Sequence, residues 1–231
     1  MLSKIKTLNA VVRQPDQLKS IAIDYGRLAL IKLGFVFYHT DRFYRGNDDR
    51  RILETQILPW YASRTEFRHI VFTGNSWYTM GYRKLFPGCR WRVIEICPRS
   101  ARRYGGEGCI NASVADADQY LAPESVDLVL FSGVFGYGLD TREELEKALA
   151  GFHRCLRQGG EMLFSWDDIP EHMPFDPLTS PSFAKFERIL FAPMHTDIVR
   201  ASVPWNKTWI FLRKAGPDQH TSSGGWLGLP A

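Results

Sequence analysis

The sequence predicts an α/β fold built on a doubly wound, mostly parallel sheet, and three observations lead to this prediction. Between residues 66 and 168, short apolar runs alternate with turns and helical segments. The run VDLVLFS at 126–132 is apolar almost throughout, as expected for a strand buried on both faces. Residues 142–157 show a helical period. Such an alternation indicates a parallel sheet covered by helices.

The elements expected in this core follow in chain order. Strands are expected at 68–73, 92–96, 109–112, 126–132 and 161–166, and helices at 77–86, 99–104 and 142–157. Residues 167–182 contain four prolines and are interpreted as a loop, with a helix near 182–191. The alternating segments IVRASVP and KTWIFLRK, separated by Trp205 and Asn206, predict a C-terminal antiparallel hairpin.

Helix 142–157 has the clearest signals. Thr141 and Glu144 have the spacing of a capping box. One apolar stripe recurs at helical spacing and consists of Leu145, Ala148, Leu149, Phe152 and Leu156. Gly159 and Gly160 are expected to form the left-handed turn that ends the helix.

Residues 1–65 are expected to form a helical cap beside the sheet. One helix is predicted over 15–33, beginning at Pro15, and another over 48–58, with Asp48 and Asp49 in its first turn and Pro59 closing it. The cap contains aromatic residues that suit either a ring-bearing substrate or packing against the sheet; these are Tyr25, Phe35, Phe37 and Tyr38. The core domain is then 66–215, followed by a Gly/Ser-rich flexible tail at 216–231.

Charge is unevenly distributed along the 231 residues. The net charge is +4, and residues 1–60 hold ten Lys/Arg against six Asp/Glu, whereas the other 171 residues hold 19 of each. This basic excess is compatible with an acidic substrate, an acidic partner protein, an anionic membrane surface or simply a solvated helical face. The sequence shows no arginine-rich run with interleaved aromatic residues, so nucleic acid is not expected as a partner.

The four cysteines show no CxxC spacing, which argues against a metal site and a disulfide framework. Cys97 and Cys109 are interpreted as reduced thiols, or alternatively as neighbours of a cofactor. The longest apolar run, 28–38, is far shorter than the roughly 20 residues of a membrane span. The first residues lack the apolar region of a secretory signal, so a cytoplasmic protein is expected.

Two features at the strand ends point to a ligand of nucleotide type. The first strand ends at Thr73 and Gly74, where a glycine permits close backbone approach. The fingerprint GxGxxG is absent here, which argues against a nicotinamide cofactor. Glu95 lies 21 residues after Gly74, at the end of the second strand, where a carboxylate can accept hydrogen bonds from both hydroxyls of a ribose.

In these respects residues 66–168 resemble the class I S-adenosylmethionine-dependent methyltransferases. Gly74, Glu95, Asp116 and the Ser132-Gly133 turn match the order and spacing of that family's loop glycine, two acids and small-residue turn. The resemblance implies a seven-stranded sheet closed by the antiparallel hairpin, and methyl transfer from S-adenosylmethionine. It implies that the cofactor contacts Thr73, Gly74, Asn75, Ser76, Trp77, Tyr78, Glu95, Ile96, Asp116, Ser132 and Gly133.

The sequence departs from the family pattern in two places. The usual GxGxG loop is reduced to GNS followed by the bulky Trp77 and Tyr78. The acid after the third strand is displaced, because Ser113 is nearest its place and Asp116 and Asp118 follow. Asp116 is therefore interpreted either as a contact to the adenine amino group or as a loop cap.

Catalytic residues are less constrained, because holding donor and acceptor in line supplies most of the acceleration in methyl transfer. A base is needed only if the acceptor must lose a proton. Candidates are Tyr137, Asp140, Asp167, Asp168 and His172, each of which is also compatible with a turn or cap role. The expected function is methylation of a small molecule. The alternatives are a non-catalytic cofactor-binding or regulatory protein, or other chemistry on this fold, such as cyclisation or isomerisation.

Overall fold

The computed structural model describes residues 26, 29, 33, 47–202 and 205–216. Apart from its three isolated residues, the predicted helix 15–33 lies outside the described residues. The same holds for the aromatic residues of the cap and for the tail beyond residue 216. The remainder shows how the sheet positions the site.

The described residues form one mixed sheet of seven strands. The strands are β1 His69–Thr73, β2 Arg90–Ile94, β3 Val126–Phe131, β4 Leu156–Asp167, β5 Phe186–Arg188, β6 Ile198–Ala201 and β7 Lys207–Lys214. Their order is β2-β1-β3-β4-β7-β5, and β6 also pairs with β7. The pairs among β1 to β4 are parallel, whereas all pairs with β7 are antiparallel. The predicted sheet class and the C-terminal hairpin of β6 and β7 are confirmed.

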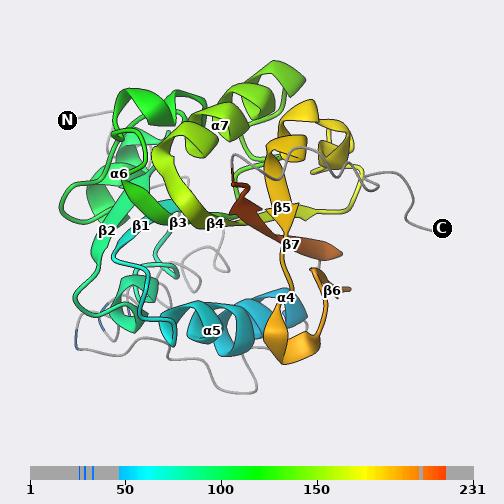
Figure 1. The fold of residues 1–231 in the computed structure, drawn as a ribbon. Helices are drawn as coiled ribbons and strands as arrows, with labels where there is room; N and C mark the ends of the chain where they lie inside the picture. The colour runs from blue at the N-terminus through cyan, green and yellow to red at the C-terminus, as the bar shows by residue number, and fades with distance from the viewer. Residues whose placement is uncertain (1–25, 27–28, 30–32, 34–46, 203–204, 217–231) are drawn as a thin grey trace, which may run out of the picture.

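Helices cover both faces of this sheet. The α-helices are α4 Asp48–Ile52, α5 Leu58–Ala62, α6 Pro98–Tyr104 and α7 Arg142–Cys155. A π-helix spans Leu53–Ile57, and 3-10 helices span Tyr82–Leu85, Val114–Gln119, Pro177–Thr179, Pro181–Lys185 and Ala192–Met194. Figure 1 shows α7 on one side of the sheet and α4 and α5 on the other.

Alternate residues of the strands supply two separate cores. On β3, Val129 packs with the apolar stripe of α7, whereas Leu128 and Leu130 pack with α4 and α5. This alternation is the two-residue period of a strand buried on both faces. The segment 48–62 therefore covers one face of the sheet together with Tyr82, Phe86, Ile189 and Phe191.

Helix α7 begins as the sequence predicts but ends differently. Thr141 and Glu144 form the capping box, with the Thr141 side chain accepting from the Glu144 N–H. The helix stops at Cys155, so Gly159 and Gly160 do not cap it and that prediction is wrong. Instead they lie in β4, where the pairing with β3 jumps from Val126–Leu156 to Leu128–Glu161. The two glycines accommodate the extra residues of this irregularity.

The helix predicted over 48–58 continues to Ala62, so Pro59 does not close it. The π-helix Leu53–Ile57 directly precedes the turn that contains Pro59. A proline inside a helix lacks an N–H and its ring clashes with the carbonyl four residues earlier. The wider π turn relieves that conflict and lets the helix run on.

No α-helix follows β1, so the prediction for 77–86 is wrong. The segment forms turns and then the 3-10 helix Tyr82–Leu85. Thr79 explains part of this, because its hydroxyl accepts from the Ser76 N–H and donates to the Ser76 carbonyl. Such local side-chain bonds compete with helix formation. The first loop therefore has no helix N-terminus to offer a ligand.

Two further predictions are corrected at the sheet edges. The expected strand 109–112 is reduced to a single bridge between Ile94 and Ile110. The expected helix near 182–191 is a short 3-10 turn followed by β5, which pairs with the end of β7. Proline at 181 and the apolar alternation after it favour the extended form once β7 offers free backbone groups.

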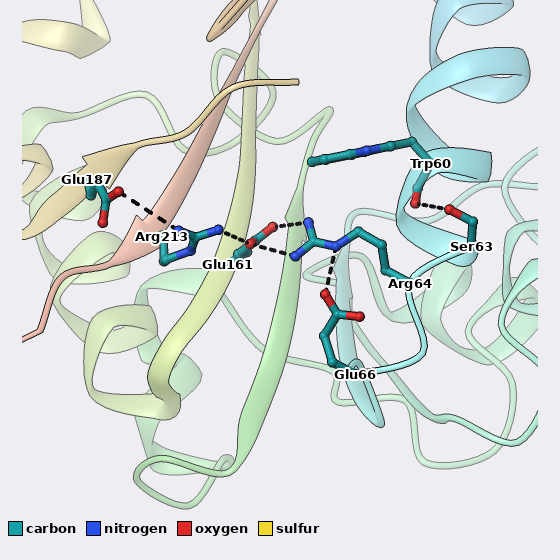
Figure 2. Close-up of polar contacts among 7 residues, drawn as sticks. All are labelled: Trp60, Ser63, Arg64, Glu66, Glu161, Glu187 and Arg213. Atoms are coloured by element: carbon teal, nitrogen blue, oxygen red, sulfur yellow. Dashed lines mark hydrogen bonds and ion pairs between the residues drawn. The ribbon is translucent and has the colours of Figure 1, made fainter. Parts of the chain in front are cut away.

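A buried charge network ties α5 to the sheet (Figure 2). Glu161 of β4 is 1% exposed and receives two hydrogen bonds from Arg64, at 2.7 and 2.9 Å, and one from Arg213 of β7 at 3.0 Å. Arg64 also pairs with Glu66 and lies over the Trp60 ring. Both oxygens of the buried carboxylate are therefore satisfied.

Candidate functional site

A cavity of about 220 Å³ opens at the carboxyl ends of β1, β2 and β3. In parallel sheets ligands bind at this edge. Helix α4 forms one wall, the loops after β1, β2 and β3 form the floor and rim, and the start of β7 forms the far wall.

The structure brings most of the predicted site residues to this cavity. Those that line it are Gly74, Asn75, Ser76, Tyr78, Glu95, Ile96, Ser132, Gly133 and Tyr137. Five do not line it, namely Thr73, Trp77, Asp116, Asp140 and Asp167. Of the weaker candidates, Ser113 lines the cavity, whereas Asp118, Asp168, His172, Cys97 and Cys109 do not.

The residues that do not line the cavity have other partners. Asp116 pairs with the Lys147 ammonium at 2.5 Å and accepts from Gln119. Asp140 accepts from the Gly138 N–H, as a turn residue does. Thr73 is fully buried in β1. Asp116 is thus placed as a loop residue at the start of a 3-10 helix rather than on the cavity wall.

Glu95 is held rigidly at the end of β2. One carboxylate oxygen accepts from the Asn75 N–H and the other from the Cys97 N–H, both at 2.7 Å. It is 8% exposed and lines the cavity. Each oxygen retains a lone pair beyond the one used by the backbone. The side chain can therefore order two loops and still accept hydrogen bonds from a ligand.

Two glycines leave bare backbone at the rim. Gly74 has φ +64°, and a Cβ there would meet a Val134 methyl at 3.0 Å and the Gly133 carbonyl at 3.3 Å. Gly133 has φ +72°, with no heavy atom within 4 Å of where its Cβ would stand. Both conformations are rare for side-chain-bearing residues. The loops after β1 and β3 thus meet closely, and Gly133 leaves room on the cavity side.

Several buried polar atoms of the lining lack a hydrogen-bond partner among the described residues. They include Asp49 Oδ1, Asn75 Oδ1 and Trp209 Nε1. Buried polar groups are nearly always paired in proteins, and orphans on a cavity wall suit a bound ligand. Together with the free lone pairs of Glu95 and the bare rim at Gly133, these atoms fit a ligand that bears hydroxyl, amino and carboxylate groups, as S-adenosylmethionine does.

A hydrogen-bonded chain closes the far wall. Asp167 ends β4 and is 2% exposed. Its Oδ1 accepts from the Lys207 ammonium at 2.6 Å and its Oδ2 from the Tyr137 hydroxyl at 2.5 Å. Tyr137 and Lys207 line the cavity. Burial, together with the hydrogen bond to Asp167 and its charge, raises the pKa of Tyr137, so it stays a neutral phenol.

Helix α4 contributes charge to the opposite wall. The Arg50 guanidinium lies 3.8 Å from the Tyr78 ring centre and 3.5 Å from Glu54. Burial raises the pKa of the neighbouring Asp49, and its backbone hydrogen bond to Arg50 and the Lys207 charge only partly oppose this. The cavity therefore has a cationic side chain on each of two walls.

Sequence reasoning missed Asp49, Arg50, Lys207 and Trp209 as lining residues. The sequence pattern indicates for Asp49 only a favourable position at the start of a helix. Lys207 reaches the cavity because the β4–β7 register places it opposite Asp167. That register is set by long-range pairing, which the local pattern does not contain. The alternation within KTWIFLRK was the one available signal, since it puts Lys207 and Trp209 on the same face.

The described part of the chain contains no cluster of three or more His, Cys, Asp or Glu side chains suited to a metal ion. None of its helices is long and apolar enough to cross a membrane.

Comparisons with known proteins agree with this fold. Residues 73–164 match the family model described as a methyltransferase domain. The fold is similar to N-methyltransferase NodS from Bradyrhizobium japonicum WM9, at 18% identity and a TM-score of 0.57, covering 74% of this chain and 98% of that one. NodS has also been solved with S-adenosyl-L-homocysteine, and that structure matches with a TM-score of 0.55, at 17% identity, over 76% of this chain and 93% of that one.

A TehB-like S-adenosylmethionine-dependent methyltransferase from Corynebacterium glutamicum ATCC 13032 Kitasato is also similar in structure. Its TM-score is 0.51 at 14% identity, over 72% of this chain and 95% of that one. Among proteins of curated function, none matches the chain in sequence. Residues 73–164 thus match a methyltransferase domain, and the chain shares the fold of these S-adenosylmethionine-dependent methyltransferases.

Proposed function

We propose that this protein is a class I S-adenosylmethionine-dependent methyltransferase that binds its cofactor in the cavity at the ends of β1 to β3 and methylates a small molecule. The observation that carries the proposal is the placement of Glu95. It is a buried carboxylate at the end of β2, with lone pairs available on the wall of a cavity whose rim is bare at Gly133.

The residues present would hold the cofactor in three parts. Glu95 would accept hydrogen bonds from the ribose hydroxyls. Ile96, Ala112 and Val114 would supply the apolar contacts beside it for the adenine ring. The backbone of Gly74 and Gly133 would flank the chain that leads to the methionine end, as close approach requires.

When bound, S-adenosylmethionine supplies an electrophilic methyl group on a positively charged sulfur. The task of the protein is then to hold an acceptor in line and to exclude water. Phe72, Tyr82 and Trp209 give the cavity apolar walls. Asp167 and Lys207 form a closely paired, buried charge couple beside it, which fixes the position of Tyr137.

A small acceptor is supported by the shape of the site. Helix α4 brings Asp49, Arg50 and Leu53 over one side of the cavity, and the volume of about 220 Å³ limits the size of the group that can enter it. A substrate much larger than this would have to reach in with an extruded part, as nucleic-acid-modifying enzymes require of a base.

Turnover measurements test the acceptor class. Wild-type protein is incubated with S-adenosylmethionine carrying a labelled methyl group, first with a cell extract restricted to small molecules and then with total RNA. Release of S-adenosylhomocysteine and transfer of label into the small-molecule fraction are expected. Label that enters RNA alone would overturn the small-molecule assignment and leave the cofactor assignment standing.

A further inference from the structure

The Tyr137 hydroxyl is a hydrogen-bond donor to Asp167, and its oxygen can therefore only accept from a ligand. Its proton is given to Asp167 Oδ2 at 2.5 Å, and the second oxygen of Asp167 is held by Lys207 at 2.6 Å. Asp167 and Lys207 are both buried, and they face each other in the β4–β7 register. A group that reaches the Tyr137 oxygen from the cavity therefore finds an acceptor, because the only proton on that oxygen is already committed.

Aromatic faces extend from Tyr137 past the rim of the cavity. The Tyr137 ring stacks on His172, with ring centres 4.5 Å apart and planes 21° apart. His172 in turn meets Trp205 edge to face at 5.6 Å. Tyr137 and Trp205 remain 45% and 44% exposed. Large exposed aromatic side chains next to a cavity are suited to stacking with a planar ligand.

We propose that Tyr137 takes up the proton of the methyl acceptor, and that the acceptor is a planar ring compound carrying an N–H or O–H. This inference rests on the proposed function. It adds a residue role and a substrate class, neither of which follows from cofactor binding.

Every bond and proton in this step is accounted for by the cofactor, the acceptor and the residues named here. As the bond from the methyl carbon to sulfur breaks, the bond from that carbon to the acceptor nitrogen or oxygen forms. The acceptor proton passes to the Tyr137 oxygen while the Tyr137 proton passes to Asp167 Oδ2. Asp167 ends protonated, and the adjacent Lys207 ammonium favours loss of that proton to water. The products are a thioether, the methylated acceptor and one released proton.

The groups around Tyr137 come from five segments. Asp49 lies on α4, Tyr78 on the first loop, Lys207 on β7, Asp167 at the end of β4 and His172 in the loop after β4. Tyr137→Phe leaves the ring and its stacking on His172 in place and removes only the hydroxyl. Tyr120→Phe is a matched control, since Tyr120 is exposed and does not line the cavity.

The first experiment measures release of S-adenosylhomocysteine with two compound sets. One set holds phenols, catechols, indoles, benzimidazoles and hydroxyquinolines, and the other holds saturated amines and aliphatic carboxylic acids. Turnover confined to members of the ring set is expected. Equal turnover with the saturated set would overturn the inference, as would failure of every ring compound with a protein that binds S-adenosylhomocysteine. A wild-type protein that does not bind S-adenosylhomocysteine would instead overturn the proposed function.

The second experiment compares the variants on the best ring compound. General-base contributions are about 10²- to 10⁴-fold, so kcat of Tyr137→Phe should fall at least about 100-fold. Its KM should change less than about threefold, and Tyr120→Phe should match wild type. The deficit should shrink as pH rises toward the pKa of the acceptor, because an ionised acceptor has no proton to give. An unchanged kcat, or a deficit equal at every pH, would contradict the proton-accepting role.

Discussion

Strand β4 carries two buried carboxylates, Glu161 in its middle and Asp167 at its carboxyl end, and the two have different surroundings. Glu161 lies opposite Arg213 and Asp167 lies opposite Lys207 in the same ladder with β7. Glu161 is enclosed by Arg64 and Arg213, far along the strand from the cavity (Figure 2). Asp167 is bonded to Lys207 and Tyr137, which both line the cavity.

The difference shows that position along a parallel strand decides what a buried ion pair does. In the middle of β4, Glu161 joins the sheet to the segment after α5, and its partners Arg64 and Arg213 do not line the cavity. At the carboxyl end, where ligands bind in such sheets, the same kind of pair orients a cavity side chain. Removal of the Glu161 carboxylate should therefore mainly reduce stability, whereas removal of the Asp167 carboxylate should also reduce turnover.

The largest loss of stability is expected for Glu161→Ala. Breaking a buried ion pair by removing one partner costs about 3–5 kcal/mol, and Arg64 and Arg213 would both be left without it. The partial exposure of both arginines puts the expected value at the lower end. Chemical denaturation measures it, with Glu187→Gln as control, because that exposed pair with Arg213 at 3.9 Å should contribute less than about 1 kcal/mol. Equal losses in the two variants would remove the structural role given to Glu161.

Asp167→Asn should reduce stability less than Glu161→Ala does, and it should also reduce turnover. The amide keeps the shape but can donate to Tyr137, so the Tyr137 hydroxyl is no longer fixed as an acceptor. Stability should fall by about 1–3 kcal/mol, as for a lost hydrogen bond to a charged group. Turnover should fall at least about tenfold, measured as release of S-adenosylhomocysteine on the best acceptor. Full activity in this variant would contradict the functional reading of the pair.

The dependence of stability on pH should depend on Asp127, a carboxylate near the amino-terminal end of β3. Asp127 is the second residue of β3 and accepts from the Arg68 and His69 N–H groups and from Arg157. Burial acts to raise its pKa, but these hydrogen bonds outweigh it and lower the pKa. Its contribution is thus present above its unfolded pKa, about 3.9, and is lost as pH falls through the lower folded pKa. Asp127→Asn should flatten this acid limb in denaturation curves. An unchanged acid limb would show that Asp127 is not a source of it.

The smallest effect is expected for Asp49 on the cavity wall. Burial raises its folded pKa, so its ionisation makes folding less favourable as pH rises from the unfolded pKa through the folded one. Asp49→Asn removes that term, and at neutral pH it should stabilise the protein by about 0.5 kcal/mol or more. Thermal unfolding at pH 7 and at pH 3 measures this. The gain should vanish at the acid pH, and a gain of equal size there would contradict it.

Local sequence patterns correctly predicted features whose structure depends on nearby residues. Thr141 and Glu144 cap α7 as their spacing requires, and Glu95 ends β2 on the cavity wall. The first loop could not be predicted, because the hydrogen bonds between Ser76 and Thr79 outweigh an apolar helical pattern. Lys207 could not be placed in the site either, since its position depends on the register between β4 and β7, which are separated by 39 residues.

Binding of S-adenosylhomocysteine to wild-type protein, Glu95→Gln and Glu107→Gln, measured by isothermal titration calorimetry, tests the central claim most directly. Glu107 is an exposed glutamate that does not line the cavity, and it serves as the control. A charge-assisted hydrogen bond is worth about 1.5–3 kcal/mol. Glu95→Gln should therefore bind roughly 10- to 100-fold more weakly, and Glu107→Gln should match wild type. Wild-type affinity in Glu95→Gln would contradict the assignment of this cavity to the cofactor.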